Sequence, residues 1–214
     1  MIKLEAVINQ TNGEFIKINN RNSQTIKFKI DDRATIDSPS FGIISNTGEL
    51  SFIDFSGEIK KAAENHILKN GMLVEIYLKD TISKCEKTIG YFMTKNWKYN
   101  INTKVASVSL VDELTELQDI KIPYRSFDHL FERDLSFEWL YRYLWNLTPS
   151  KYDFLDFDSL DNDTKNVLTY KKFEFVFWEE MSLWNAWDSL CVACFCHLYK
   201  DFNGKSVFKY IGGN

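Results

Sequence analysis

The placement of glycine divides this chain into two parts of different character. Six of its nine glycines fall within residues 1–122, where they separate short runs of alternating apolar and polar residues, and residues 123–200 contain none. Alternation with a period of two is typical of half-buried strands. The second part instead carries apolar residues at spacings of three and four, which is typical of helices. The sequence therefore predicts an α+β protein with domains at residues 1–122 and 123–214.

The first domain is predicted to be a small β-barrel-like domain with one inserted helix. Residues 41–45 and 50–55 flank Asn46-Thr47-Gly48, a turn in which glycine can adopt positive φ, so we expect a hairpin. Ser56 is predicted to cap a helix that ends at Asn70-Gly71. The other expected strands are residues 25–30, 72–78, 88–97 and 104–110, and a short helix is expected after Asp112.

The second domain is predicted to be a mixed helical and β domain. Ser136 is expected to cap a helix that runs to Asn146, and Ser182 to cap the strongest helix of the chain. Between these helices we expect an acidic loop at residues 151–165 and a strand at residues 172–178. The face of the Ser182 helix is expected to consist of Trp184, Trp187, Cys191, Cys194 and Leu198.

The end of the chain is predicted to be a β-hairpin. Asn203-Gly204 stands between residues 198–202 and 205–211, and this dipeptide is the usual two-residue hairpin turn. The sequence then stops at Gly212-Gly213-Asn214 without an obvious closing element. We therefore expect the second domain to be truncated, with more polypeptide downstream of Asn214 in the parent protein.

The amino-acid composition excludes several classes of protein. The chain is 44% hydrophobic and 26% charged with a formal net charge of −4, which is typical of a folded globular protein. Its mild negative charge disfavours a protein that coats nucleic acid. The N-terminus lacks the apolar core of a signal peptide, and no run of about 18 apolar residues predicts a membrane helix. Four cysteines are too few for a disulfide scaffold, so we expect a reducing compartment and no membrane partner.

The densest group of reactive side chains is Cys191-Val192-Ala193-Cys194-Phe195-Cys196-His197. Thiolates and imidazole are zinc ligands, but a zinc ribbon needs a second ligand pair, and the one other cysteine is Cys85. Haem attachment needs a cysteine three residues before Cys196, where Ala193 stands. Packing as small buried side chains is the favoured interpretation, and metal binding is the alternative.

Two further patterns resemble ligand sites incompletely. The acids Asp153, Asp156, Asp158, Asp161 and Asp163 could hold Ca²⁺, but they lack the spacing and the glycine of an EF-hand, so a solvated loop is favoured. Asn203-Gly204-Lys205-Ser206 resembles the end of a phosphate-binding loop, but Tyr199 stands where that motif needs its first glycine. We therefore predict no metal and no cofactor.

No catalytic motif is recognisable. The chain has neither a G-x-S-x-G nor an H-E-x-x-H pattern. His66 is expected on the apolar side of a helix, and His129 has acids nearby that most surfaces would also supply. The pair Glu179-Glu180 could serve a glycosidase but is better explained by the favourable position of negative charge before the Ser182 helix. We predict that the chain is not an enzyme and has no catalytic residue.

Aromatic residues are in excess, with 17 Phe, 10 Tyr and 6 Trp. Core packing accounts for most of them. The remainder could be buried against further copies of the chain or other subunits, or exposed tryptophans could stack on sugars. The densest run comprises Phe173, Phe175, Phe177, Trp178, Trp184 and Trp187.

The order in which several motifs follow one another along the chain is informative. After the run at residues 41–54 and a helix, Gly71 precedes an alternating strand, Gly90-Tyr91-Phe92 gives a G-x-F strand, and Asp112-Glu113-Leu114 gives a D-x-L turn. This order resembles the first barrel of tail-tip or baseplate hub proteins of tailed bacteriophages. Residues 199–205, a D-x-x-G-K hairpin after a helix rich in small residues, resemble the second hub domain.

This resemblance covers residues 25–211, apart from the acidic and aromatic segment at 150–180. It implies a virion structural protein, the N-terminal part of a hub that is made in the bacterial host cytoplasm and located in the virion tail. Such hubs form rings, with a trimer favoured, that join the tail tube to a spike or fibre. The implied partners are further copies of the chain and other tail proteins, and DNA would pass through the lumen without specific binding. No catalytic residue is implied.

Two other functions stay open. A host-surface carbohydrate-binding module would use exposed Trp and Asp side chains in a concave site. A cell-wall hydrolase would have its lytic domain downstream of Asn214. The sequence alone does not identify the residues of an interface or of a ligand site.

Overall fold

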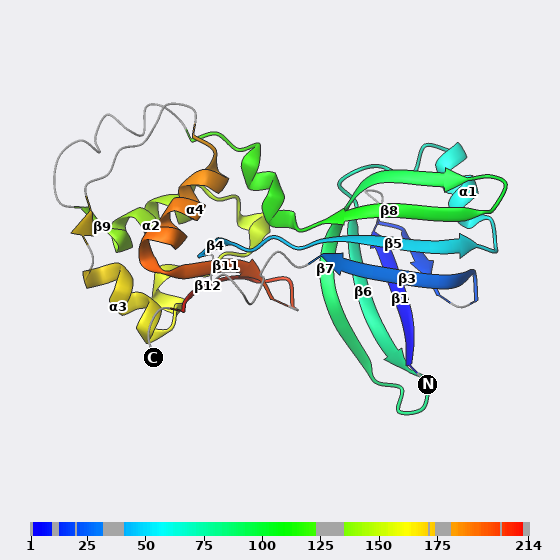
Figure 1. Cartoon of the computed structure of the whole chain (residues 1–214), viewed down its shortest axis with the longest axis horizontal. Helices are drawn as coiled ribbons and strands as arrows, with labels where there is room; N and C mark the ends of the chain where they lie inside the picture. The colour runs from blue at the N-terminus through cyan, green and yellow to red at the C-terminus, as the bar shows by residue number, and fades with distance from the viewer. Residues whose placement is uncertain are drawn as a thin grey trace. The chain divides into compact units, whose positions relative to one another are not determined.

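The computed structural model describes residues 2–9, 13–19, 21–31, 41–122, 135–170, 172–173, 181–201 and 203–211. The chain forms two compact units (Figure 1). Residues 1–32 and 46–113 make the first unit, and residues 33–45 and 114–214 make the second. Each unit has its own cluster of buried apolar side chains. The predicted α+β class is confirmed.

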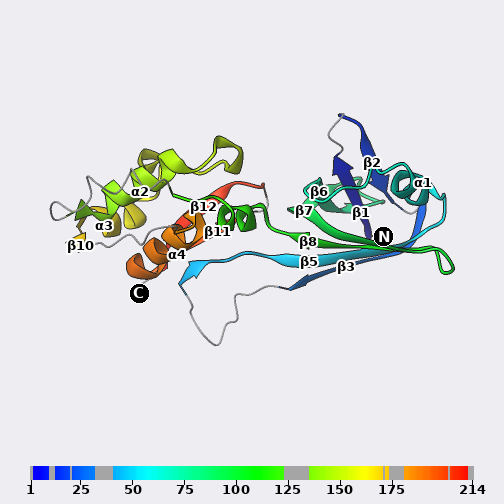
Figure 2. The ribbon, with the colours of Figure 1, turned by 90° about the horizontal axis from the view of Figure 1, so that it is seen from above.

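The first unit is a seven-stranded antiparallel sheet with one short helix. The strands form because buried and exposed side chains alternate along them: Leu50 and Phe52 of one strand and Ala106, Val108 and Leu110 of its neighbour all point into the core. Figure 2 shows the adjoining strands β3, β5 and β8 of this sheet. The strands are β1 (Ile2–Asn9), β2 (Phe15–Ile18), β3 (Ser23–Asp31), β5 (Thr47–Asp54), β6 (Leu73–Asp80), β7 (Glu86–Asn100) and β8 (Val105–Val111).

The predicted closure of this sheet into a barrel is not confirmed. The strand order is β2-β1-β6-β7-β8-β5-β3, and no ladder joins the two end strands over the described residues. The start of β3 is irregular, because its register against β5 shifts between Gln24 and Lys27 and Thr25 adopts a positive φ of 50°. Such a bulge bends a strand and locally interrupts its pairing. The sheet is open, with β2 and β3 at its edges over the described residues.

The hairpin predicted around Asn46-Thr47-Gly48 is wrong. β4 (Gly42–Ile43) pairs in parallel with a strand of the second unit, whereas β5 pairs with β3 and β8. Gly48 is not a turn residue: a Cβ there would lie 2.8 Å from the backbone oxygen of Lys29 on β3. This glycine therefore permits the close approach of two strands, and the chain continues from one unit to the other without turning back.

The inserted helix, α1 (Glu58–Glu64), is shorter than predicted. Its N-cap is Gly57 rather than Ser56, and the buried Asp54 carboxylate accepts hydrogen bonds from the backbone N–H groups of Gly57 and Lys60. The helix ends before His66, which adopts a left-handed φ of 56°, and not at Asn70-Gly71. A capping carboxylate two residues further upstream thus replaces the expected serine.

The second unit combines helices with a small sheet. The predicted N-caps are confirmed: the Ser136 hydroxyl accepts from the Trp139 N–H and the Ser182 hydroxyl from the Asn185 N–H. The elements from η1 onward are η1 (Glu113–Gln118), β9 (Leu135–Ser136), α2 (Phe137–Leu147), η3 (Ser150–Tyr152), η4 (Phe157–Ser159), α3 (Asn162–Tyr170), β10 (Lys172–Phe173), α4 (Leu183–Cys194), β11 (Cys196–Lys200) and β12 (Ser206–Tyr210).

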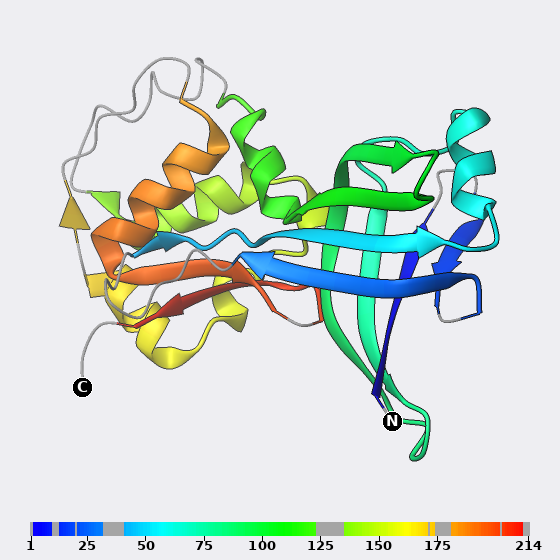
Figure 3. The same ribbon diagram turned by 45° about the vertical axis from the view of Figure 1, so that its right-hand side comes forward.

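The small sheet has the order β12-β11-β4, and α4 packs on β4 and β11 (Figure 3). The C-terminal hairpin of β11 and β12 is confirmed, but its loop is longer than the predicted two residues. Asp201 holds this loop, because its carboxylate accepts from the N–H groups of Asn203 and Lys205. Gly204 adopts a positive φ of 78° in the turn.

The acidic loop predicted at residues 151–165 is wrong. This segment forms η3, η4 and the start of α3 because its acids cap short helices: Asp156 accepts from the Ser159 N–H and Asp161 from the Thr164 N–H. The strand predicted at 172–178 is described only at Lys172–Phe173, which pairs with β9. Residues 174–180 lie outside the described residues.

The compact units differ from the predicted domain ranges at two places. Residues 33–45 group with the second unit, and so do residues 114–122, whose Leu114, Leu117 and Ile122 belong to its buried cluster. The boundary at 122/123 stays a prediction about independently folding domains. No helix among the described residues is both long and apolar enough to cross a bilayer.

Candidate interface surfaces

The cysteine cluster lies in the core of the second unit. Cys191, Cys194 and Cys196 are fully buried, and Cys85 is exposed in the first unit. Burial raises the pKa of the Cys191 thiol well above its usual range. A metal would need the thiolate form, so this environment favours packing, as the sequence interpretation did. Among the described residues, no group of three or more His, Cys, Asp or Glu side chains could hold a metal ion.

Three of the five acids considered as calcium ligands have other partners. Asp156 and Asp161 are helix caps, and Asp158 pairs with Arg142, whose Nη2 lies 3.0 Å from the carboxylate. Hydrogen bonds with Ser159 lower the pKa of Asp156. Arg142 also pairs with Glu138 and lies over the ring of Phe157. This segment is therefore held together by local contacts.

Among the described residues, the others that the sequence suggested as candidates for a catalytic or binding site are not gathered at one site. His66 is exposed in the turn after α1, and Lys205 is exposed in the β11–β12 loop, whereas the Ser206 hydroxyl is buried and donates to the backbone oxygen of Tyr152. His129 and Glu179-Glu180 lie outside the described residues. The structure does not bring His66 and Lys205 into one compact unit.

Much of the aromatic excess is accounted for by the core of the second unit. Tyr141, Trp187 and Phe208 are buried and meet edge to face or tilted, with ring centroids 5.1–5.9 Å apart. Trp184 is half-buried against the same cluster. Of the densest aromatic run in the sequence, Phe175, Phe177 and Trp178 lie outside the described residues, as does the side chain of Phe173.

Two tryptophans of α2 are partly exposed. Trp139 is 36% exposed and stacks on Tyr143 at a ring separation of 5.2 Å and an interplanar angle of 7°. Trp145 is 38% exposed, and its indole N–H donates to the backbone oxygen of Phe154. Both side chains are thus partly exposed and also make a contact within the unit.

The outward face of the first sheet carries an ordered set of polar side chains that the sequence interpretation missed. The register places Lys27, Ser51, Ser107 and Lys98 in one row across β3, β5, β8 and β7. The next row across the same strands is Lys29, Glu49, Ser109 and Lys95. We call these eight residues the lysine–serine face.

The lysines border this face and the short side chains occupy its centre. Lys27 and Lys29 lie on β3, and Lys95 and Lys98 on β7, three strand positions away. At about 4.8 Å per strand, the two lysine pairs are separated by about 14 Å. Lys27, Lys95 and Lys98 are exposed, and no ion pair with a described residue engages them. The centre contains one acid, Glu49, so the eight residues carry a net charge of +3.

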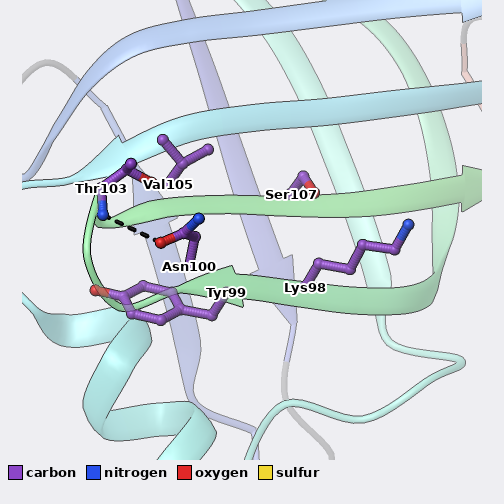
Figure 4. A pocket seen from close by; sticks show the side chains of 6 residues that line it. All are labelled: Lys98, Tyr99, Asn100, Thr103, Val105 and Ser107. Atoms are coloured by element: carbon purple, nitrogen blue, oxygen red, sulfur yellow. Dashed lines mark hydrogen bonds between the residues drawn. The ribbon is translucent and has the colours of Figure 1, made fainter.

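A shallow hollow of about 490 Å³ adjoins one end of the lysine–serine face. Figure 4 shows Lys98 of β7 and Ser107 of β8 on adjoining strands, with Val105 and Thr103 toward the hairpin turn. The turn is held by Asn100, whose side-chain oxygen accepts from the N–H groups of Asn102 and Thr103. These hydrogen bonds order the backbone at this end of the hollow.

A second hollow lies between β2 and α1. Phe15, which is 64% exposed, and Ile67 line it together with Ala62 and the polar Asn22 and Glu58. The Asn22 side chain donates to the backbone oxygen of Lys17 and to Glu58, so it ties the helix to this edge strand. α1 therefore lies near the β2 edge of the sheet, and β3 forms the other edge.

Solved structures of phage-type tail proteins are similar to this fold. The 43 kDa tail protein of prophage MuSo2 from Shewanella oneidensis matches with a TM-score of 0.55 at 12% identity, over 97% of this chain and 55% of that protein. The tail protein from Neisseria meningitidis MC58 matches with a TM-score of 0.54 at 12% identity, over 96% of this chain and 50% of that protein.

No protein-family model and no curated protein sequence matches the chain. The chain spans about half the length of the two tail proteins that it matches. At 12% identity the likeness concerns the fold, and it extends over nearly all of this chain. The resemblance to tail proteins that the sequence indicated is therefore confirmed at the level of the fold.

Proposed function

We propose that this chain is a structural protein of a phage-type virion tail and acts without catalysis. The observation that carries the proposal is the likeness to two tail proteins over 97% and 96% of the chain, which includes both compact units. A likeness that spans two different units is more specific than one to a single common sheet. The proposed location is the tail of the virion.

We further propose that the chain forms a hub ring of identical subunits, with a trimer favoured, between the tail tube and a spike or fibre. The open sheet supports this proposal, because β2 and β3 lack a ladder partner on their outer sides among the described residues. An edge strand can pair with the edge of another subunit, and closed rings satisfy every such edge. In this ring each first domain would complete a barrel-like wall.

Light scattering over a concentration series tests the ring. The expected result is a species of three times the chain mass of 25.2 kDa that persists on dilution. A monomer at all concentrations, in a sample whose melting transition is cooperative, would contradict a ring formed by this chain alone. Negative-stain microscopy of the same fractions would then show whether other tail proteins are needed, because a ring would appear only after they are added.

A carbohydrate-binding module is the second candidate. Trp139 supports it, since its ring stacks on Tyr143 and is 36% exposed, and α2 also carries the ion pair of Glu138 and Arg142. Aromatic rings next to polar groups are typical of ligand sites. A glycan array is the test: binding that Trp139→Ala abolishes and Trp145→Ala leaves unchanged would favour this candidate over a purely structural role.

A further inference from the structure

The lysine–serine face combines features that a phosphate backbone requires. Its lysines stand at both borders, and its centre consists of short hydroxyl side chains and Glu49. Lysine and serine are among the side chains that contact DNA phosphates without reading sequence. The chain as a whole has a net charge of −4, so the positive charge of this face is local rather than a property of the protein.

We propose that the lysine–serine face binds the phosphate backbone of duplex DNA weakly and without sequence preference. This inference rests on the register and charges of the first sheet and stands independently of the ring. The two lysine pairs are separated by about 14 Å, which is comparable to the width of about 12 Å of the DNA major groove. Flexible lysine side chains on the two borders can therefore contact the two backbones that flank one groove.

The composition of the face favours DNA over an acidic protein. Stable protein interfaces bury an apolar or aromatic centre, often with arginine, and are depleted of lysine there. The two central rows instead place Ser51, Ser107 and Ser109 between lysines, without any apolar anchor. The eight residues also lack arginine, the side chain that most often reads guanine, so we expect no sequence readout.

The geometry also explains why the binding is expected to be weak. Four lysines offer at most four phosphate contacts, and Glu49 reduces the local potential. Each contact releases counterions and makes the affinity depend on salt, with a logarithmic slope of about 0.9 per phosphate neutralised. Weak binding of this kind holds DNA near a surface and still lets it slide.

The test is a fluorescence anisotropy titration of the whole chain with labelled duplexes of about 20 base pairs and two unrelated sequences, between about 50 and 200 mM salt. We expect equal affinity for both sequences and a decline with salt. The triple variant Lys27→Gln/Lys95→Gln/Lys98→Gln should lower affinity at least about tenfold at the lowest salt and reduce the logarithmic salt slope by about 2.7.

A control variant that removes the same number of charges separates the effect of the lysine–serine face from the effect of net charge. Lys61, Lys84 and Lys87 are exposed lysines of the same unit that lie outside the two rows. Lys61→Gln/Lys84→Gln/Lys87→Gln should keep the wild-type affinity to within about twofold and the wild-type slope. Equal losses in the two triple variants would show that only the general charge matters and would overturn the assignment, as would the absence of DNA binding by the wild type.

Three further measurements make the test conclusive. Ser107→Asp places a negative charge in the centre of the face and should weaken binding even if a lysine variant folds poorly. Circular dichroism melts of each variant check folding. Poly-glutamate of matched charge is the competitor that represents an acidic protein: if it binds as tightly as DNA and is lost with the same substitutions, the DNA assignment is wrong.

Discussion

Single residues in this chain explain where local sequence patterns mislead. Gly42 adopts a φ of 135°, and a Cβ at this position would lie 2.5 Å from Oδ1 of Asp188. The same carboxylate accepts a hydrogen bond of 2.9 Å from the Ile43 N–H. A residue that resembled part of a hairpin is thus required for docking on α4, which only the tertiary structure reveals.

Gly42→Ala is therefore expected to destabilise the second unit. It combines left-handed strain with a clash against Asp188, and we expect the free energy of unfolding to fall by about 2–3 kcal/mol in a urea titration. Gly13→Ala is the matched control, since Gly13 has a φ of 83° and nothing within 4 Å of its Cβ position. That variant should lose only about 1 kcal/mol. Equal losses would show that the contact with Asp188 adds nothing.

The raised pKa of Tyr152 makes the free energy of unfolding depend on pH in the alkaline range. Burial, together with a hydrogen bond from its hydroxyl to Glu116, raises the pKa of Tyr152 from 10.0 to about 12. Because the folded pKa is the higher one, the stabilisation is complete below about pH 10 and is lost as the pH rises toward 12. Urea unfolding of wild type and Tyr152→Phe should differ most below pH 10, and the difference should shrink as the pH rises toward 12. A difference that is constant with pH would contradict this coupling.

Elements defined by local signals could be predicted, and elements defined by distant partners could not. Ser136 and Ser182 precede helices that the sequence predicts, because an N-cap acts within three residues. The pairing of Gly42 with His197 and the row from Lys27 to Lys98 depend on registers between distant segments. The alternating positions of Lys27 and Lys29 can be recognised in the sequence. The strand that pairs with them in the sheet cannot.

The outer edge of β12 shows how one element is protected from further pairing. The Tyr210 N–H donates to the Thr164 hydroxyl, and the Ser206 N–H donates to the backbone oxygen of Asp153. The Thr164 hydroxyl also donates to the Asp161 carboxylate, so one fully buried side chain joins α3, its cap and the strand.

Thr164→Val tests this junction. The substitution keeps the shape but leaves the Tyr210 N–H and one oxygen of Asp161 without this partner, and we expect a loss of about 1–3 kcal/mol of unfolding free energy. Thr164→Ser keeps the hydroxyl and should lose less, despite its missing methyl group. If the serine variant is the less stable of the two in thermal melts, packing rather than hydrogen bonding governs the site.

At the scale of the whole molecule, each unit is built from two separate stretches of the chain. The second unit takes β4 from within the sequence of the first unit. A fragment of residues 114–214 therefore lacks the parallel partner of β11 and exposes that edge.

We expect this fragment to aggregate or to unfold without cooperativity when made alone. A peptide of residues 33–45 added in excess should restore a cooperative melt, because it supplies β4 and its contact with Asp188. The same peptide with Gly42→Ala should restore it far less. A fragment that melts cooperatively and remains monomeric without any peptide would show that β4 is dispensable.

The position of β4 also sets an order for folding during synthesis. The ribosome makes Gly42 and Ile43 long before their partners His197 and Leu198. All strands of the first sheet have been synthesised once the chain reaches Val111. That sheet can therefore form while β4 still lacks its partner strand β11. Pairing across so long a stretch of sequence is entropically slow. Until β11 has been synthesised, β4 is an unpaired edge that a chaperone or a neighbouring nascent copy could occupy.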